Sequence, residues 1–203
     1  MITYTIKKGV FSDSKALILL NEEGKEVSPL EILHKTEPHR VYAFEGQMGA
    51  GKTTLGKAFA RSLGLSFIDL DWYIEERFHK TVQQLFAERS EEGFRELERR
   101  MLHEVSEFED VVISTGGGTP CFFDNMEYMN KQGATVFLRV DPKVLFRRLR
   151  VAKQQRPLLA QKSDEELMDF INAALEKRMP YYSKAKHIFG GEELEDKKQI
   201  QQS

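Results

Sequence analysis

The residues with the clearest chemical signature run from Gly46 to Thr53 and read Gly-Gln-Met-Gly-Ala-Gly-Lys-Thr, the G-x-x-x-x-G-K-T pattern of a phosphate-binding loop. A short apolar, β-prone run at 41–44 precedes this pattern, and apolar residues at helical spacing follow it. A strand, a glycine loop and a helix in this order make backbone N–H groups and the positive end of the helix converge on one anion. A chance glycine-rich turn is the alternative, and this context argues against it. The sequence therefore predicts a site for ATP or GTP.

Side chains that could complete such a site lie within the loop and after the next predicted strand, 66–69. Lys52 should reach the β- and γ-phosphates, and the Thr53 hydroxyl should ligate Mg²⁺. Asp69 and Asp71 are two positions apart at the strand end, so alternation in extended chain places both carboxylates on one side. One could hold Mg²⁺ through water, and the other could orient or deprotonate a substrate hydroxyl. The plain alternative is that an aspartate here only caps a helix.

A second glycine-rich stretch, Gly116–Gly118, directly follows the β-branched run 111–115, which is typical of a central buried strand. Consecutive glycines cost conformational entropy, and close approach of the backbone to a ligand is a good reason to keep them. The strand ends in Ser114-Thr115, where P-loop proteins usually carry an aspartate that helps to bind Mg²⁺. Asp69 is therefore the better candidate for the metal.

Three arginines could bind an anionic group, but their types and positions alone favour ordinary, solvated arginines with no role in a site. Arg95 and Arg178 lie in predicted helices beside glutamates, where most arginines are solvated and ion-paired. Arg156 lies in a polar stretch between two helices, where it could close over a phosphate as part of a lid or be an ordinary loop arginine. The residues alone leave these alternatives open.

Composition limits the classes of protein that remain. The chain has 203 residues, 40% of them hydrophobic, and a net charge of −2, which fits one α/β domain and gives no reason to expect nucleic acid or a membrane as partner. The single cysteine excludes an internal disulfide and makes structural zinc unexpected. No apolar run approaches the roughly 18 residues of a membrane span. We expect a cytoplasmic, monomeric protein.

The predicted elements alternate between strand and helix, which indicates a parallel sheet with ligands at the carboxyl ends of its strands. We expect strands at 41–44, 66–69, 111–115, 135–140 and 185–189. We expect helices after the P-loop and at 70–86, 92–105, 124–132, 143–153 and 163–179, with Pro180 ending the last one. Residues 1–40 form an N-terminal extension of unknown role, with strands at 3–6 and 16–20, a turn at 21–24 and a short helix from Ser28. Residues 41–203 form the main domain.

Several motifs together resemble the shikimate kinase family of small P-loop metabolite kinases. In chain order they are Gly46-x-Met-Gly-Ala-Gly-Lys-Thr-Thr54, Phe67-Ile-Asp-Leu-Asp71 with Ile74-Glu75, Phe94-Arg95 with Glu98, Thr115-Gly-Gly-Gly118, Arg156-Pro-Leu-Leu159 and Glu176-x-Arg-x-Pro-x-Tyr182. The resemblance runs from about Val41 to Phe189. It implies a three-layer α/β fold like that of nucleoside monophosphate kinases, with a five-stranded, mostly parallel sheet and a small N-terminal appendage.

The resemblance also implies an activity and a division of roles. The reaction would convert ATP and shikimate to ADP and shikimate 3-phosphate, with Mg²⁺ held by Thr53 and by Asp69 behind its waters. Arg156 would be the lid arginine. The residues implied to bind ATP are Gly49, Ala50, Gly51, Lys52, Thr53, Thr54 and Arg156.

On the acceptor side, the resemblance implies that Asp71 accepts a hydrogen bond from the hydroxyl to be phosphorylated. Arg95 and Arg178 would clamp the substrate carboxylate, which suits their planar guanidinium groups. Catalysis would then rest on Lys52, Asp71 and Arg156. The residues implied to bind shikimate are Asp71, Arg95, Gly116, Gly117, Gly118 and Arg178.

Two other interpretations remain open from the residues. One is a related small-molecule kinase acting on gluconate or adenylylsulfate, although the full set of motifs favours shikimate. The stretch 42–54 also resembles the ATPase that assists threonylcarbamoylation of tRNA, although that likeness ends near Gly64. ADP release that depends on shikimate would distinguish the kinase from a non-kinase P-loop ATPase.

Overall fold

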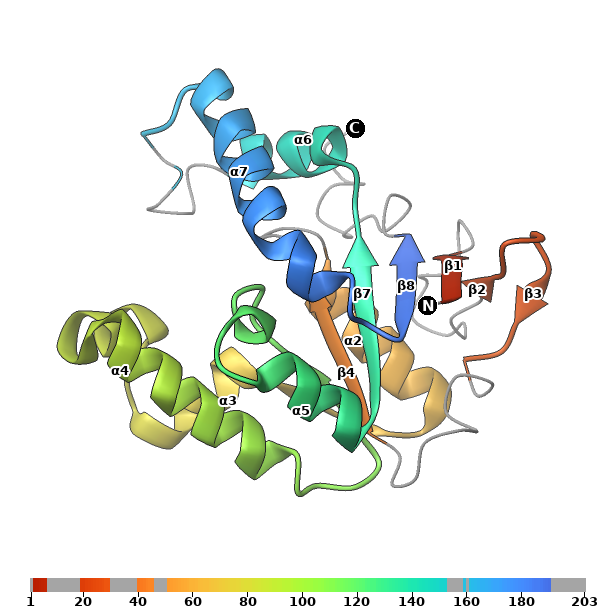
Figure 1. Cartoon of the computed structure of the whole chain (residues 1–203), viewed down its shortest axis with the longest axis horizontal. Helices are drawn as coiled ribbons and strands as arrows, with labels where there is room; N and C mark the ends of the chain where they lie inside the picture. The colour runs from red at the N-terminus through yellow and green to blue at the C-terminus, as the bar shows by residue number, and fades with distance from the viewer. Residues whose placement is uncertain are drawn as a thin grey trace.

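The computed structural model describes residues 2–6, 19–29, 40–45, 51–152, 159 and 161–190. Within these ranges, eight strands form one sheet in the order β3-β2-β1-β8-β7-β4-β6-β5 (Figure 1). The strands are β1 (Ile2–Ile6), β2 (Leu19–Leu20), β3 (Glu26–Val27), β4 (Arg40–Glu45), β5 (Ser66–Asp69), β6 (Val111–Ser114), β7 (Ala134–Arg139) and β8 (His187–Gly190). The helices are α2 (Lys52–Leu63), α3 (Leu70–Phe78), α4 (Val82–Val105), α5 (Asn125–Gln132), α6 (Pro142–Ala152) and α7 (Asp164–Tyr182), with a short 3₁₀ helix η1 (Thr119–Cys121).

The five strands expected in the main domain are consecutive and parallel, but the described sheet has eight strands rather than the expected five, because the N-terminal strands extend it. β5, β6, β4, β7 and β8 are neighbours in that order, and each adjacent pair is parallel. Asp69 of β5 and Ala43 of β4 both lie opposite Ser114 of β6, so these three strands end at the same edge of the sheet. The predicted α/β class and parallel core are therefore confirmed.

Helices cover both faces of this sheet, which gives the three layers that were expected. Figure 1 shows α2 behind β4 and β7, with α3, α4 and α5 on the opposite side. Alternation along β6 supports this arrangement, because Val112 packs in the core with Leu55 and Phe59 of α2, whereas Ile113 packs in the core with Phe94 of α4. No described helix has the length and apolar character that crossing a membrane would require.

The N-terminal strands extend the same sheet rather than forming a separate hairpin on its surface. β1 pairs in parallel with β8 over four residue pairs, and β2 and β3 continue antiparallel at the edge. Tyr4 and Leu19 of these strands are buried in the core that also contains Phe189. The strand at 3–6 and the turn at 21–24 are confirmed, and β3 was not expected. The helix expected from Ser28 falls mostly on residues 30–39, outside the described residues.

The structure has a break between two helices where the sequence predicted one continuous helix. The sequence pattern predicted a single helix over 70–86, and this prediction is wrong because α3 ends at Phe78. His79 follows with a positive φ of 52°, and Thr81 begins α4 with a capping box, in which its hydroxyl accepts from Gln84 N–H and the Gln84 side chain accepts from Thr81 N–H. Apolar periodicity continues across both helices, so it could not reveal the break.

Pro180 does not end α7 as predicted. The helix continues to Tyr182, and Ser183 N–H donates to Met179 O at 2.9 Å just beyond it. Proline removes one backbone donor, and a helix can still complete its last turn when the following N–H groups find partners. The extra residues carry the Tyr182 side chain against the sheet, where it stacks on Phe137 at 4.9 Å between ring centroids.

Candidate active site

The first turn of α2 is the described part of the P-loop. Gly51 adopts a φ of 97°, a left-handed conformation that favours glycine, and Lys52, Thr53 and Thr54 follow as the first helical residues. The N–H groups at this end of α2 have no partners within the helix and can bind a phosphate. Gly49 and Ala50, which were also expected to bind ATP, lie outside the described residues.

Asp69 caps α3 and also faces the P-loop helix. Its Oδ1 accepts from the backbone N–H of Asp71 at 3.1 Å and of Trp72 at 3.3 Å. Its Oδ2 accepts from the Thr53 hydroxyl at 3.4 Å. The capping role and the metal role suggested by the sequence therefore do not exclude each other, because they use different oxygens of one carboxylate.

The oxygens at this strand edge suit a magnesium ion. Mg²⁺ prefers hard oxygen ligands, and Thr53 and Asp69 already place a hydroxyl and a carboxylate within hydrogen-bonding distance. Ser114 lies directly opposite Asp69 in the parallel register, so its side chain points to the same face of the sheet. Its hydroxyl oxygen is buried and has no hydrogen-bond partner in the described part of the chain. The residues present therefore fit the metal implied by the P-loop.

Asp71 lies between the P-loop and the helix that carries Arg95. Burial raises the pKa of the Asp71 carboxyl, the negative charges of Asp69 and Glu75 add to this rise, and the positive charges of Lys52 and Arg95 oppose it. Asp69, not Asp71, is the N-cap of α3, so the plain capping explanation does not apply to Asp71. Its carboxylate is instead held where two cations act on it.

Arg95 is not the solvated surface arginine that its sequence neighbours suggested. Its side chain is only 14% exposed, and its guanidinium lies 4.1 Å from the centroid of the Phe122 ring. Nη1 donates to Glu98 Oε2 at 3.1 Å, and Nη2 lies 3.6 Å from Glu91 Oε1. Its Nε is buried without a hydrogen-bond partner among the described residues. A buried guanidinium with spare donors can bind an incoming anion.

Two glycines of the loop after β6 lie close to side chains from other elements. A Cβ atom at Gly118 would lie 3.0 Å from Arg95 Nη2. A Cβ atom at Gly116 would lie 3.2 Å from Thr119 Oγ1 and 3.5 Å from both Asp71 Oδ1 and Glu98 Oε1. The sequence suggested glycines that approach a ligand, and the structure adds that the lack of a side chain at Gly118 leaves room for the Arg95 guanidinium.

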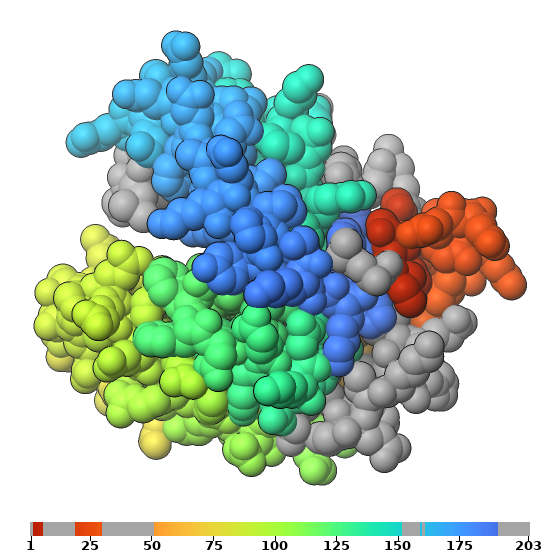
Figure 2. Space-filling model, viewed as in Figure 1, coloured from red at the N-terminus to blue at the C-terminus, as the bar shows by residue number. Residues whose placement is uncertain are grey.

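The C-terminal end of α7 contacts the same loop. The Tyr182 hydroxyl donates to Gly117 O at 2.5 Å. Arg178 lies one turn earlier on α7, and its charge acts on the Cys121 thiol of η1 together with that of Arg95, where both oppose the rise in pKa that burial causes. The charges of the two arginines therefore act on the same short segment, although the residues are far apart in the sequence. Figure 2 shows a recess in the molecular surface between α4 and α7.

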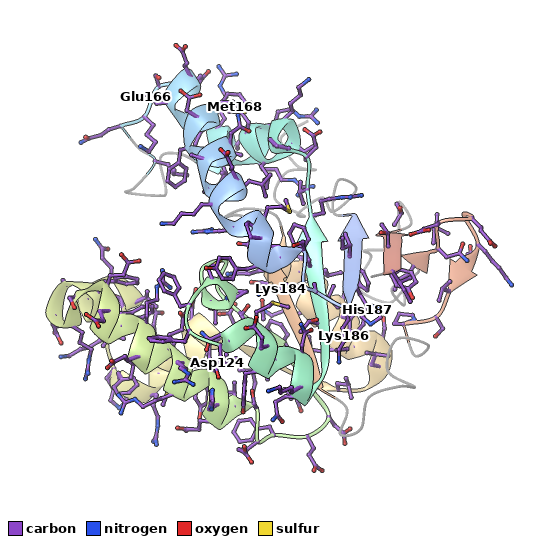
Figure 3. The ribbon with its side chains drawn as sticks, viewed as in Figure 1. Asp124, Glu166, Met168, Lys184, Lys186 and His187 are labelled. Atoms are coloured by element: carbon purple, nitrogen blue, oxygen red, sulfur yellow. The ribbon has the colours of Figure 1, made fainter. Side chains whose placement is uncertain are left out.

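The N-terminal end of α7 lies away from the glycine loop, and the segment that follows Tyr182 leads into β8. Figure 3 shows Glu166 and Met168 at the opposite end of α7 from Lys184, and Lys184, Lys186 and His187 on the path into β8. Lys184 pairs with Glu127 of α5 at 2.7 Å, which ties this path to α5. Arg156, expected as a lid residue, lies outside the described residues.

Sequence reasoning assigned no role to three residues that hold the site together. Thr119 was not singled out, and its hydroxyl donates to Glu98 at 2.7 Å. Glu98 and Tyr182 were identified only as positions within the family motifs, and neither was given a role. A polar residue directly after a glycine loop, in Thr119-Pro120, was the one available signal for Thr119, and its partner in α4 could not be identified before the fold was known.

The similarity of this chain to known proteins agrees with this geometry. The family model for shikimate kinase matches residues 48–203, which is more than half of the chain. The chain belongs to the shikimate kinase family. Its fold and the order of its motifs agree with this assignment, which covers the P-loop, the glycine loop and α7 together.

The individual proteins that this chain resembles are also shikimate kinases. A shikimate kinase from Phocaeicola vulgatus is 81% identical over 158 residues, which cover 78% of this chain and 90% of that protein. The crystal structure of shikimate kinase from Bacteroides thetaiotaomicron superposes with a TM-score of 0.75 at 70% identity, covering 81% of this chain and 93% of that one. The shikimate kinase from Acinetobacter baumannii, solved in complex with shikimate, gives a TM-score of 0.66 at 30% identity, covering 82% and 92%.

The likeness to a tRNA-modifying ATPase does not account for these matches. That likeness ended near Gly64, whereas the match to the shikimate kinase family continues to residue 203. The segments beyond Gly64 carry Asp69, Asp71, Arg95 and the glycine loop, which together form the site.

Proposed function

We propose that this protein transfers the γ-phosphoryl group of ATP to the 3-hydroxyl of shikimate, giving ADP and shikimate 3-phosphate, in the biosynthesis of aromatic amino acids. The observation that carries this proposal is the position of Asp71, a partly buried residue whose carboxylate lies beside Gly116 and on which the charges of Lys52 and Arg95 both act. A phosphoryl donor on the Lys52 side and a carboxylated acceptor on the Arg95 side would meet at Asp71. Membership of the shikimate kinase family supports shikimate as that acceptor.

The nucleotide phosphates would lie at the N-terminus of α2. The backbone N–H groups from Gly49 to Thr54 would bind the phosphate oxygens, and Lys52 would reach the β- and γ-phosphates. Arg156 would close over the transferring group and offset its charge. These contacts would align the γ-phosphorus with the acceptor and stabilise charge in the transition state.

The metal would be held at the Thr53 and Asp69 oxygens. The Thr53 hydroxyl would ligate Mg²⁺ directly, and Asp69 would accept hydrogen bonds from its waters. When bound, Mg²⁺ neutralises negative charge on the β- and γ-phosphate oxygens.

The acceptor would be held by groups from three elements. Arg95 on α4 and Arg178 on α7 would bind its carboxylate, because a planar guanidinium matches a carboxylate with two donors. The backbone of Gly116, Gly117 and Gly118 would contact its ring substituents. Asp71 would accept the hydrogen bond of the hydroxyl that attacks.

The chemical step needs no covalent enzyme intermediate. The acceptor oxygen forms a bond to the γ-phosphorus while the bond from that phosphorus to the β–γ bridging oxygen breaks and ADP leaves. The hydroxyl proton passes to Asp71 and from there to solvent. Burial raises the pKa of Asp71, which makes it a better proton acceptor than an exposed aspartate. Positioning and charge stabilisation supply most of the catalysis.

We also propose that residues 41–203 form the catalytic unit and that residues 1–40 lie outside it. Every residue assigned a role above lies after Val41. β1 lies in the sheet beside β8, and three strands separate it from β6 and its glycine loop. The extension would therefore act on stability rather than on chemistry.

A coupled assay of ADP release tests the proposal. Purified protein is given ATP, Mg²⁺ and one acceptor from a panel that contains shikimate, gluconate, quinate and adenylylsulfate. We expect ADP release with shikimate and only background with the others. Protein with Lys52→Ala measures the background from contaminating ATPases. ADP release that is equal with and without shikimate would contradict the proposal and favour a non-kinase ATPase.

A further inference from the structure

The Glu98 carboxylate joins two residues of the acceptor side. It is 2% exposed, its Oε2 accepts from Arg95 Nη1 at 3.1 Å, and its Oε1 accepts from the Thr119 hydroxyl at 2.7 Å. One oxygen is thus fixed by η1 while the other holds the guanidinium on α4. A buried carboxylate needs such partners, because desolvation without them disfavours its charged form.

The backbone of Thr119 is itself fixed by hydrogen bonds at its N–H and at its carbonyl. Its N–H donates to Gly116 O at 3.2 Å, and its carbonyl accepts from Asn125 Nδ2 at 2.9 Å. The residue has no exposed surface. Its hydroxyl is therefore a fixed donor that links the glycine loop to α4, and the absence of a Cβ at Gly116 leaves the space for it.

The charge on Glu98 depends on this donor. Burial raises the pKa of the Glu98 carboxyl and the charge of Asp71 adds to the rise, whereas the hydrogen bond from Thr119 and the contact with Arg95 lower it. Without the hydroxyl, Oε1 would be buried and unpaired. The carboxylate would then protonate more easily or turn, and either change would release Arg95.

We propose that Thr119 is a positioning residue that fixes the Glu98 carboxylate, which in turn holds the Arg95 guanidinium in place for the carboxylate of the acceptor. This inference rests on the function proposed above. It assigns a kinetic role to a residue that touches neither the acceptor nor the nucleotide.

The test replaces Thr119 by valine, which keeps the shape and removes the donor. Losing a hydrogen bond to a buried charge should raise the KM for shikimate about tenfold, with kcat and the KM for ATP changed less than about twofold. Thr119→Ser restores the hydroxyl and should restore most of the KM. Thr119→Ala lacks it and should resemble valine, so the serine and alanine pair gives the same test if valine does not fold.

A matched control is available at a second buried threonine. Thr135 of β7 is fully buried, and its hydroxyl donates to Asn130 Oδ1 of α5 at 2.6 Å and accepts from Lys186 N–H at 2.9 Å, away from the glycine loop. Thr135→Val should lower the melting temperature without moving the KM for shikimate. This comparison separates the loss of any buried hydroxyl from the loss of this one.

The pH dependence of kcat/KM for shikimate provides a second test, because a merely structural role of Thr119 would leave it unchanged. The charged groups facing Glu98 are Arg95 on its own helix and Asp71 on α3, with the Thr119 hydroxyl on η1. Removing the hydroxyl raises the pKa of Glu98 further, so the acidic limb of kcat/KM for shikimate should move to higher pH in Thr119→Val and remain in place in Thr119→Ser.

The outcomes separate this inference from the proposed function. Wild-type protein that does not phosphorylate shikimate would overturn the function. Wild-type protein that does so, with a Thr119→Val variant of unchanged KM and unchanged pH profile, would overturn only the role of Thr119. A fall in kcat at constant KM, in proportion to lost folded protein, would also overturn it.

Discussion

Arg95 shows at the scale of one residue how burial changes what a side chain can do. Its guanidinium is enclosed by Phe122, Glu98 and the backbone of Gly118. Enclosure removes water that would compete for the guanidinium, so an anion that reaches it is bound strongly. Residue type and helical spacing alone could not distinguish this arginine from the exposed Arg100 on the same helix, and only the family resemblance singled it out.

We predict that Arg95→Ala raises the KM for shikimate far more than the KM for ATP. Truncating one partner of a buried, hydrogen-bonded charge pair costs about 2–5 kcal/mol. Steady-state kinetics with each substrate varied in turn would measure the difference. Arg100→Ala, on the exposed side of α4, is the matched control and should behave as wild type. Equal losses for both substrates would argue against a role on the acceptor side.

Asp71 carries a cost to stability that follows from its pKa. Burial raises the pKa of this carboxyl above its ordinary value of 3.8, so the folded protein keeps the proton to a higher pH than the unfolded chain does. Stability is therefore lost as pH rises through the interval between the two pKa values. At neutral pH the ionised carboxylate is retained for chemistry at the expense of stability.

Asp71→Asn should therefore abolish most of the activity and raise the melting temperature at neutral pH. In acid, where the wild-type carboxyl is protonated in both states, the gain in melting temperature should vanish. Thermal melts at both pH values measure this difference. Asp169→Asn, at an exposed position of α7, is the control and should show no such pH-dependent gain. A variant that melts lower than wild type at neutral pH would contradict the assignment.

Among the helices, α7 supports the glycine loop through the hydrogen bond of Tyr182. The Tyr182 ring is fully buried, and its hydroxyl donates to Gly117 O. This contact depends on α7 continuing past Pro180, which sequence reasoning did not anticipate. The helix thus positions Arg178 and the loop together.

Tyr182→Phe should lower the free energy of unfolding by about 1 kcal/mol, because it leaves a backbone carbonyl without its donor. It should also raise the KM for shikimate severalfold, since the loop that faces the acceptor loses a support. Denaturant unfolding and steady-state kinetics would measure the two effects. Tyr181→Phe, at the half-buried neighbouring position, is the control. An unchanged KM would show that the loop is held well enough without this bond.

Element boundaries mark where sequence reasoning failed and why. Apolar periodicity identified the strands and most helices, because burial on one face is a local pattern. It missed the break at His79, since a left-handed residue and a capping box interrupt a helix without interrupting its apolar face. The non-helical Ser90 lies just before the predicted start at residue 92, so that boundary was nearly right.

The site shows the same division between local and non-local information. The P-loop, Asp69 and Asp71 could be predicted because each follows a recognisable strand. The contact between Thr119 and Glu98 joins residues 21 positions apart. Such pairings depend on how η1 packs against α4, and no pattern within either segment specifies it.

At the scale of the whole molecule, the N-terminal strands belong to the sheet and to its core. β1 pairs with β8, and Tyr4 packs edge-to-face on Phe189 with 5.6 Å between ring centroids. This core contains α2 residues such as Phe59 but none of the charged residues of the site. Stability and chemistry can therefore be separated by mutation.

Tyr4→Ala should lower the free energy of unfolding by about 3 kcal/mol, as truncation of a buried aromatic ring does elsewhere. Below the melting temperature, the KM for shikimate and kcat should stay at wild-type values. Denaturant unfolding and kinetics at low temperature would test both statements. Thr5→Ala, at the exposed neighbouring position, should leave stability nearly unchanged. A large change in KM for Tyr4→Ala would connect the extension to the site.

The most direct test of the central claim is the identity and stoichiometry of the product. Wild-type protein is incubated with ATP, Mg²⁺ and shikimate, and phosphorus NMR and mass spectrometry follow ADP and the phosphorylated acceptor together. If Lys52, Asp71 and Arg95 form one site, each ADP should appear with one molecule of shikimate 3-phosphate. ADP accompanied by inorganic phosphate, with shikimate recovered unchanged, would contradict it.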